Sequence, residues 1–172
     1  MDDLDLQKLM DKQSITERLL DYARGVDRID RELICSVFQE GAHLDYGAMF
    51  VGTGEEFADF IGVVHPAMEA HSHHLSNICI TVDGDRAGSE TYVLARLRSR
   101  GPDGTLNDTV SSGRYVDQWV RQGGEWRIAH RNYLHCMDST RGAGAPGYPA
   151  TGDRSVSDPS YAVLALTSIE GA

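Results

Sequence analysis

One short stretch of the chain is rich in histidine. Of seven histidines in all, His65, His71, His73 and His74 lie close together. An imidazole with its ordinary pKa of about 6.5 can act as a general base or, when neutral, as a metal ligand. His71 and His73 would share one face of a strand, but no third ligand is evident and no HExxH spacing occurs. The pattern predicts no metal site and leaves acid–base chemistry beside ordinary surface histidines.

Three further side chains are candidates for the same chemistry. Asp27 follows the end of an amphipathic helix, Tyr22 lies on the apolar stripe of that helix, and Arg131 lies on the last predicted strand. Each also fits a structural role, as a solvated loop carboxylate, a hydrogen-bonded core tyrosine and an arginine on a polar face. Taken one at a time, these patterns leave both interpretations open.

The elements that would position these residues begin with helices up to about residue 40. Ser14 and Glu17 form a capping box, and Gly25 could end the helix that follows. Asp30 is a good cap for a second helix, from Arg31 to Phe38. The first helix carries an apolar stripe with spacings of four, three and four: Ile15, Leu19, Tyr22 and Val26.

A short strand is predicted from Ala42 to Tyr46. Thr53 and Glu56 form another capping box, which opens a third helix. That helix should stop at His65, because the residue before a proline avoids helical backbone angles.

The chain then changes to β-branched and aromatic residues, broken by turns rich in Gly and Asp that indicate hairpins. Long antiparallel strands must bend, and Gly88 or Gly113 could supply a bulge. Helices followed by strands predict an α+β fold, a cone in which the N-terminal helices pack in a strongly curved antiparallel sheet. The predicted strands are Leu75–Val82, Arg86–Arg98, Thr105–Arg121 and Glu125–Met137.

Strict alternation along the last strand assigns its side chains to two faces. Arg131 and Tyr133 share one face, while Trp126 and Ile128 take the other. Together with Trp119, the latter would make an apolar outer surface, and exposed patches of that kind usually meet a partner. We therefore predict a homo-oligomer, either a trimer or a dimer.

The bulk composition limits the classes of partner. The 172 residues suit one domain with a sizeable core, and the formal net charge is −10. This charge argues against binding to nucleic acid or to an anionic membrane, since both require basic patches. The charged N-terminus is not a signal peptide, no segment has the length of a membrane span, and three dispersed cysteines give no disulfide framework. A cytoplasmic protein is expected.

Residues 1–137 are predicted to form the domain, and residues 138–172 a C-terminal extension that is partly flexible. The extension is rich in Gly, Ser, Pro and Asp and contains one apolar run, Tyr161 to Leu166. We interpret that run as a docked tail, packed on a neighbour or closing the pocket mouth.

Three segments together resemble one known family, the SnoaL-like group of the NTF2 superfamily, over residues 5–137. Its relatives include dehydratases, dehydrochlorinases, polyketide cyclases and ketosteroid isomerases. The resemblance implies the cone fold and a cofactor-free enzyme, although some members of this fold have no catalytic activity. The three segments are Leu20-Asp21-Tyr22-Ala23-Arg24-Gly25-Val26-Asp27, His73-His74-Leu75-Ser76-Asn77 and Trp126-Arg127-Ile128-Ala129-His130-Arg131-Asn132.

The resemblance also implies roles for individual residues. His73 would be the catalytic base, and its spacing to Asn77 favours it over His74. Asp27 would accept a hydrogen bond from the other ring nitrogen and stabilise the imidazolium. Arg131 would hold Asp27 ionised or meet developing negative charge.

The remaining roles concern the substrate. Tyr22 would donate a hydrogen bond to a carbonyl or departing oxygen, and Tyr46 and Phe50 are predicted to line the pocket. We expect a lyase that carries out β-elimination on a hydrophobic cyclic or aromatic small molecule, with loss of water or formaldehyde. The alternatives are an isomerase or cyclase on a steroid- or polyketide-like substrate, and a non-catalytic ligand-binding or assembly module.

Overall fold

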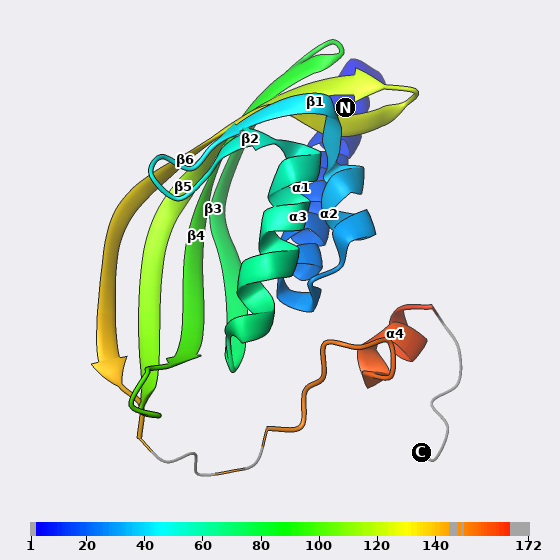
Figure 1. Cartoon of the computed structure of the whole chain (residues 1–172). Helices are drawn as coiled ribbons and strands as arrows, with labels where there is room; N and C mark the ends of the chain where they lie inside the picture. The colour runs from blue at the N-terminus through cyan, green and yellow to red at the C-terminus, as the bar shows by residue number, and fades with distance from the viewer. Residues whose placement is uncertain (1–2, 145–147, 149, 166–172) are drawn as a thin grey trace.

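The computed structural model describes residues 3–144, 148 and 150–165. Three helices lie against the concave face of one curled sheet, and a short fourth helix lies near the C-terminal end of α1 (Figure 1). The predicted α+β cone is therefore confirmed. The elements are α1 (Asp3–Arg28), α2 (Arg31–Val37), β1 (Phe38–Asp45), β2 (Val51–Thr53), α3 (Gly54–Val64), η1 (His65–Ala67), β3 (Ala70–Asp83), β4 (Arg86–Arg100), β5 (Leu106–Gln122), β6 (Glu125–Gly142) and α4 (Pro159–Leu164).

The six-stranded sheet has the order β2-β1-β6-β5-β4-β3. Strands β3 to β6 form the predicted antiparallel meander, but β1 runs parallel to β6, so the sheet is mixed. The predicted antiparallel pairing thus holds for β3 to β6, and the pairing of β1 with β6 adds one parallel pair. Between β1 and β6 the chain passes through β2, α3 and strands β3 to β5, so no hairpin joins the two strands and they can pair in parallel.

Helix α1 buries the predicted stripe, because Ile15, Leu19, Tyr22 and Val26 are each at most 2% exposed. Two predictions about its ends were wrong. Ser14 does not open the helix but lies within it, since α1 begins at Asp3. Gly25 does not end it.

Gly25 is needed for close packing between helices. A Cβ atom there would lie 3.0 Å from the Cγ1 atom of Ile34 in α2. The helix ends instead at Arg28, because the following residue, Ile29, has a φ of 57° that breaks the helical path. Asp30 then caps α2 by accepting from the Leu33 amide, as predicted.

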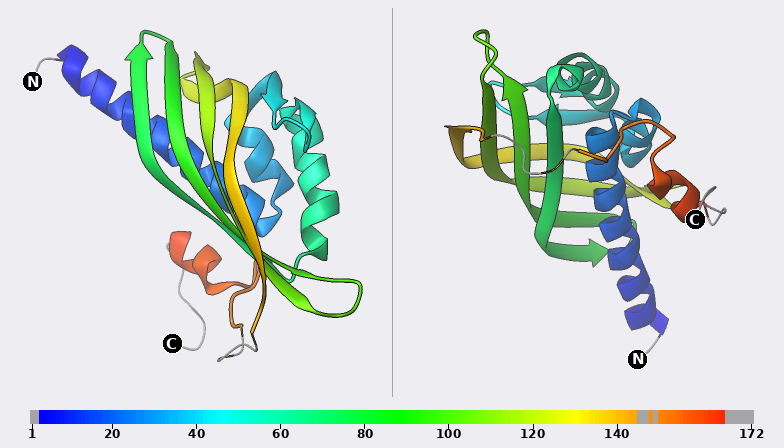
Figure 2. Two further views of the ribbon diagram at one scale, coloured as in Figure 1. Left: turned by 90° about the vertical axis from the view of Figure 1, so that its left-hand side faces the viewer. Right: turned by 90° about the horizontal axis from the view of Figure 1, so that it is seen from below.

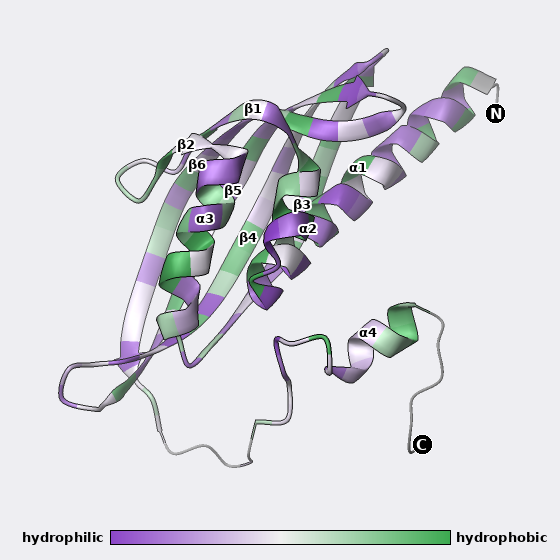
Figure 3. Cartoon of the chain, turned by 45° about the vertical axis from the view of Figure 1, so that its right-hand side comes forward, coloured by the Kyte–Doolittle hydropathy of each residue, from purple (hydrophilic) through white to green (hydrophobic). Residues whose placement is uncertain are grey.

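Helix α3 begins and ends as predicted. Thr53 and Glu56 make the capping box at its start, and the helix stops before His65 and Pro66, which form the 3-10 turn η1. Figure 3 shows hydrophobic colouring on α3 and on the strands behind it. This packing fixes His65 at the edge of the core.

A bulge in β6 overturns the predicted alternation of that strand. Ile128 pairs with Trp119 and His130 with Gln118, so Ala129 has no partner in the register. The extra residue brings Arg131 onto the same face as Trp126 and Ile128, and all three side chains point to the interior, where each is at most 2% exposed. Trp119 is also buried, so the predicted apolar outer face does not consist of these residues.

Other apolar side chains are exposed on the molecule. On the long strands these are Tyr92, Leu94, Val110, Leu134 and Met137. The N-terminal end of α1 projects beyond the sheet (Figure 2) and exposes Leu4, Leu9 and Met10. Homo-oligomerisation remains a prediction on this basis. No described helix is long and apolar enough to cross a membrane.

The C-terminal segment contacts the outer side of α1. Arg28 donates to both carboxylate oxygens of Asp158, at 3.2 and 3.3 Å, and the Arg24 guanidinium lies 4.9 Å from the ring centre of Tyr161. Hydrogen bonds from Ser160 and from the Asp153 amide lower the pKa of Asp158 to about 2, so this carboxylate is ionised at neutral pH. Residue 166, the end of the predicted apolar run, lies outside the described residues.

Gly113 allows β6 to approach β5 at a second bulge. A Cβ atom at this position would lie 2.4 Å from Cε2 of Tyr133 and 2.7 Å from the Leu134 carbonyl oxygen. We therefore expect Gly113→Ala to lower the free energy of unfolding by about 1–3 kcal/mol, measured by urea denaturation.

Gly88→Ala is the matched control, since its Cβ atom would have only one neighbour, at 3.9 Å. We expect it to unfold at nearly the wild-type urea concentration. Equal loss of stability in both variants would contradict this account of Gly113.

Candidate active site

Asp27 and His73 form a hydrogen-bonded pair. The Nδ1–H group of His73 donates to Oδ1 of Asp27 at 2.7 Å, and the His73 backbone amide donates to Oδ2 at 3.0 Å. The carboxylate thus holds both the ring and the main chain of His73. With Nδ1 protonated, Nε2 of the neutral ring carries the lone pair. The ring is 12% exposed and lines an interior cavity.

The secondary structure explains why these two residues meet. Asp27 lies in the last turn of α1, not beyond the helix as predicted, and faces the start of β3. His73 pairs with Ala95 of β4 and turns inward, whereas the exposed His74 makes its ring hydrogen bond with the Ser72 hydroxyl. Successive residues on a strand face opposite sides, so only His73 is placed to contact Asp27.

The cavity has a volume of about 620 Å³ and a mostly apolar, aromatic lining. Tyr46 contributes to this lining, as predicted. Phe50 does not, because its ring packs against Phe57 and Phe60 at 5.3 and 5.4 Å instead. The principal lining residues are Tyr22, Val26, Tyr46, Phe57, Phe60, Ile61, His65, His73, Val93, Tyr115 and Tyr133.

Two tyrosine hydroxyls meet inside this lining. The Tyr22 and Tyr46 oxygens are 2.7 Å apart, so one donates to the other, and the second proton is left for another acceptor. Burial raises the pKa of both phenols, that of Tyr22 well above its usual value. Both groups therefore stay protonated at neutral pH and can serve as donors.

Arg131 is paired with Asp117 and not with Asp27 as predicted. Its Nε and Nη2 atoms donate to the two Asp117 oxygens, each at 2.7 Å, and both side chains are fully buried. The guanidinium lies 4.2 and 4.1 Å from the ring centres of Tyr22 and Tyr115. Arg131 therefore supports the aromatic wall from behind. Arg131 lies directly opposite Asp117 in the register of β5 and β6, whereas Asp27 is bonded to His73 on β3, and this explains the difference.

Two more histidines lie beside His73. The His65 and His73 rings are nearly parallel with centroids 6.2 Å apart, and Nδ1 of His65 is 3.3 Å from Nε2 of His71. Burial, with His71 and His73 nearby, lowers the pKa of His65 to about 4, and burial also lowers that of His71. Within the described residues, no group of His, Cys, Asp and Glu side chains could hold a metal ion.

Sequence reasoning did not single out Asp117, Tyr115 or His65 for the site. Asp117 had one available signal, since it alternates with Tyr115 and Trp119 on a strand face that is otherwise apolar. His65 was noted in the histidine-rich stretch and as the stop of a helix, but no role in the site was assigned to it. Its entry into the cavity depends on how α3 packs against the sheet.

The chain was compared with known proteins. The model of the SnoaL-like domain matches residues 7–132. An uncharacterized protein of Mycobacterium tuberculosis is 26% identical over 137 residues, which cover 78% of this chain and 91% of that protein. A candidate scytalone dehydratase from Novosphingobium aromaticivorans is 26% identical, with a TM-score of 0.67, and the match covers 83% of this chain and 97% of the other.

A hexachlorocyclohexane dehydrochlorinase from Novosphingobium barchaimii has a TM-score of 0.71 at 21% identity, over 85% of this chain and 99% of that one. At this identity the likeness concerns the fold. The match of the family model to most of the chain shows that the protein belongs to the SnoaL-like family. The predicted family is thereby confirmed.

The buried ion pair provides a stability prediction. Asp117→Asn leaves the Arg131 charge without a counter-ion inside the core, so we expect a loss of about 3–5 kcal/mol in the free energy of unfolding. The double variant Arg131→Met, Asp117→Leu leaves no unpaired charge. Its loss in the free energy of unfolding should therefore be smaller than the summed losses of the single variants Arg131→Met and Asp117→Leu. Urea denaturation of all variants measures both effects, and strict additivity would contradict the coupling.

His65 makes stability depend on pH. Its folded-state pKa of about 4 lies below the usual 6.5, so the unfolded chain binds a proton at a higher pH than the folded chain does. The folded state is therefore most stable, as far as His65 is concerned, above pH 6.5, and it loses stability as the pH falls toward 4. We expect wild type to lose on the order of 2–3 kcal/mol more than His65→Gln over this range. Parallel curves of stability against pH would contradict the assignment.

Proposed function

We propose that the protein is a cofactor-independent lyase that eliminates a leaving group from a hydrophobic cyclic or aromatic molecule. The observation that carries the proposal is the Asp27–His73 pair, whose imidazole lines the aromatic cavity. A ring or carboxylate directed to bulk water would favour a binding module instead. Here the His73 ring is largely buried and lines the cavity, and its Nε2 atom has no hydrogen-bond partner among the described residues.

In the proposed reaction, Nε2 of His73 removes a proton from a carbon of the substrate. Asp27 accepts from Nδ1–H, fixes the tautomer and stabilises the imidazolium that forms, as a carboxylate does in a catalytic triad. The C–O bond at the adjacent carbon then breaks, and the proton on His73 passes to the departing hydroxyl to form water. The imidazole is neutral again at the end of the cycle, and no external acid is consumed.

The tyrosine pair would act at the substrate oxygen. One of the two hydroxyl protons of Tyr22 and Tyr46 is available for a ligand, and donors that are fixed in place stabilise a developing oxyanion. The Arg131 guanidinium behind the Tyr22 ring adds positive potential at this point. The proposed role of Arg131 is therefore indirect.

The cavity favours an apolar, flat substrate. Tyr46 is stacked on Phe57 and Tyr133 at ring distances of 4.7 and 5.4 Å, so the wall presents aromatic surfaces. A volume of about 620 Å³ is within the range of pockets that take molecules of one to several rings. The exclusion of water from such a site strengthens the polar contacts within it.

The test is turnover of a panel of hydrophobic β-hydroxy carbonyl and 1,3-diol compounds without added cofactor, followed by mass spectrometry. We expect wild type to release water or formaldehyde from at least one compound. Asp27→Asn and His73→Ala should lower kcat/KM by about 10²–10⁴-fold, because each removes part of the base.

His74→Ala is the matched control, since it changes the neighbouring ring that faces away from Asp27. It should retain activity. A product of unchanged mass would replace the lyase by an isomerase. Binding without turnover by folded wild type would contradict the enzyme and favour the ligand-binding module.

A further inference from the structure

His65 is a second imidazole in the cavity, and the proposed elimination does not yet use it. It caps the C-terminal end of α3, where its backbone amide donates to the Ile61 carbonyl, and Pro66 restricts the chain that follows. Its side chain is 7% exposed and lines the same cavity as His73. The described residues provide a hydrogen-bond partner for its Nδ1 atom but none for Nε2.

The proton positions in this cluster follow from the C-terminal segment. Nη2 of Arg154 lies 3.1 Å from Nδ1 of His71, and a guanidinium can only donate, so Nδ1 of His71 is the acceptor. On the other side of the ring, Nε2 lies 3.1 Å from the Val26 carbonyl oxygen, which can only accept. Both contacts therefore require the same neutral tautomer of His71, with its proton on Nε2.

The tautomer of His71 in turn determines that of His65. The Nε2–H group of His71 is shared between the Val26 carbonyl oxygen at 3.1 Å and Nδ1 of His65 at 3.3 Å. Because protonated Nε2 has no lone pair to accept with, Nδ1 of His65 must be the acceptor. The proton of a neutral His65 ring must then lie on Nε2, the nitrogen that has no partner among the described residues. Burial keeps this ring neutral at physiological pH, since its pKa is lowered to about 4.

The two cavity imidazoles are thus complementary. Asp27 leaves His73 with a free acceptor nitrogen, and His71 leaves His65 with a free N–H donor. Their centroids are 6.2 Å apart, which lets both contact neighbouring atoms of one molecule, since each hydrogen bond spans about 3 Å.

We propose that His65 is a catalytic residue whose Nε2–H group donates a hydrogen bond to the substrate oxygen that gains negative charge as His73 removes the proton. This inference rests on the proposed elimination. His65 keeps its own proton throughout, so the proton balance of the reaction is unchanged. Arg154 is a positioning residue that acts on His65 through His71.

The first experiment determines the tautomers in the protein without ligand. Nitrogen-15 shifts of the histidine rings, measured by NMR at neutral pH, should place the proton of both His65 and His71 on Nε2. Arg154→Met should give a tautomer mixture at His71. Arg24→Met is the matched control, because Arg24 contacts Ser160 and Tyr161 of the same segment but none of the histidines. A proton on Nδ1 of His65 would overturn the proposal.

The second experiment uses whichever panel compound wild type converts. His65→Phe keeps a ring but removes both nitrogens, and should lower kcat by about 100-fold with little change in KM. His65→Gln can place an amide N–H near the same point and should recover part of this loss. Arg154→Met should lower kcat by about 5-fold, the value of one hydrogen bond, and Arg24→Met should leave it unchanged.

These results separate the two proposals. Unchanged kcat in both folded His65 variants would overturn the role of His65 and leave the lyase intact. No turnover by wild type would contradict the lyase itself, whatever tautomers the spectra show. Urea denaturation of each variant identifies any loss of activity that results from unfolding.

Discussion

The buried ion pair of Arg131 and Asp117 is the interaction on which the cavity wall depends. Two fully buried charges are tolerated because they are joined by two parallel hydrogen bonds of 2.7 Å. The planar guanidinium then offers its face to Tyr22 and Tyr115. Burial alone would lower the pKa of Arg131, but the Asp117 carboxylate keeps it well above its usual value, so the positive charge behind the phenols is permanent.

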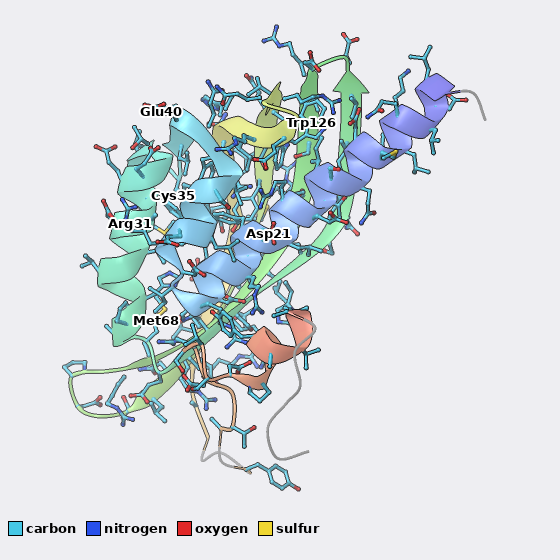
Figure 4. The ribbon with its side chains drawn as sticks, turned by 90° about the vertical axis from the view of Figure 1, so that its right-hand side faces the viewer. Asp21, Arg31, Cys35, Glu40, Met68 and Trp126 are labelled. Atoms are coloured by element: carbon cyan, nitrogen blue, oxygen red, sulfur yellow. The ribbon has the colours of Figure 1, made fainter. Side chains whose placement is uncertain are left out.

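The interior contains an aromatic region near β5 and β6 and a polar region near the C-terminal end of α1. Toward β5 and β6, aromatic rings give an apolar surface with one free hydroxyl proton. Toward the C-terminal end of α1, charged and polar contacts hold His73 at Asp27 and connect His71 to Arg154. Arg154 also donates to the carbonyl oxygen of Met68, which follows η1. Figure 4 shows Met68 and Trp126 well apart, Met68 toward the C-terminal segment and Trp126 on the far side of the helices from it. No described residue from 150 to 165 lines the cavity, so this segment acts on the site from outside.

Family membership and a proposed chemistry rest on different observations. The fold of this chain is shared with proteins of several activities, so it does not select one. What favours elimination is local: a base with a fixed tautomer, a hydroxyl pair that stays protonated, and a second imidazole that must remain neutral. A non-catalytic module would not require Asp27 to hold His73 by a hydrogen bond with one ring nitrogen directed to the cavity.

The sequence by itself determined the α+β class, the stripe on α1 and the caps of α2 and α3, because these depend on spacings within one element or between adjacent residues. It misplaced Arg131, Phe50 and the two tryptophans. Strict alternation assumes an unbroken strand, whereas the bulge at Ala129 puts Trp126 and Ile128 on the same buried face as Arg131. The partner of Arg131, the entry of His65 into the cavity and the reach of Arg154 to His71 were decided only by the tertiary structure. Each joins elements that are far apart in the chain, and no local periodicity encodes such a contact.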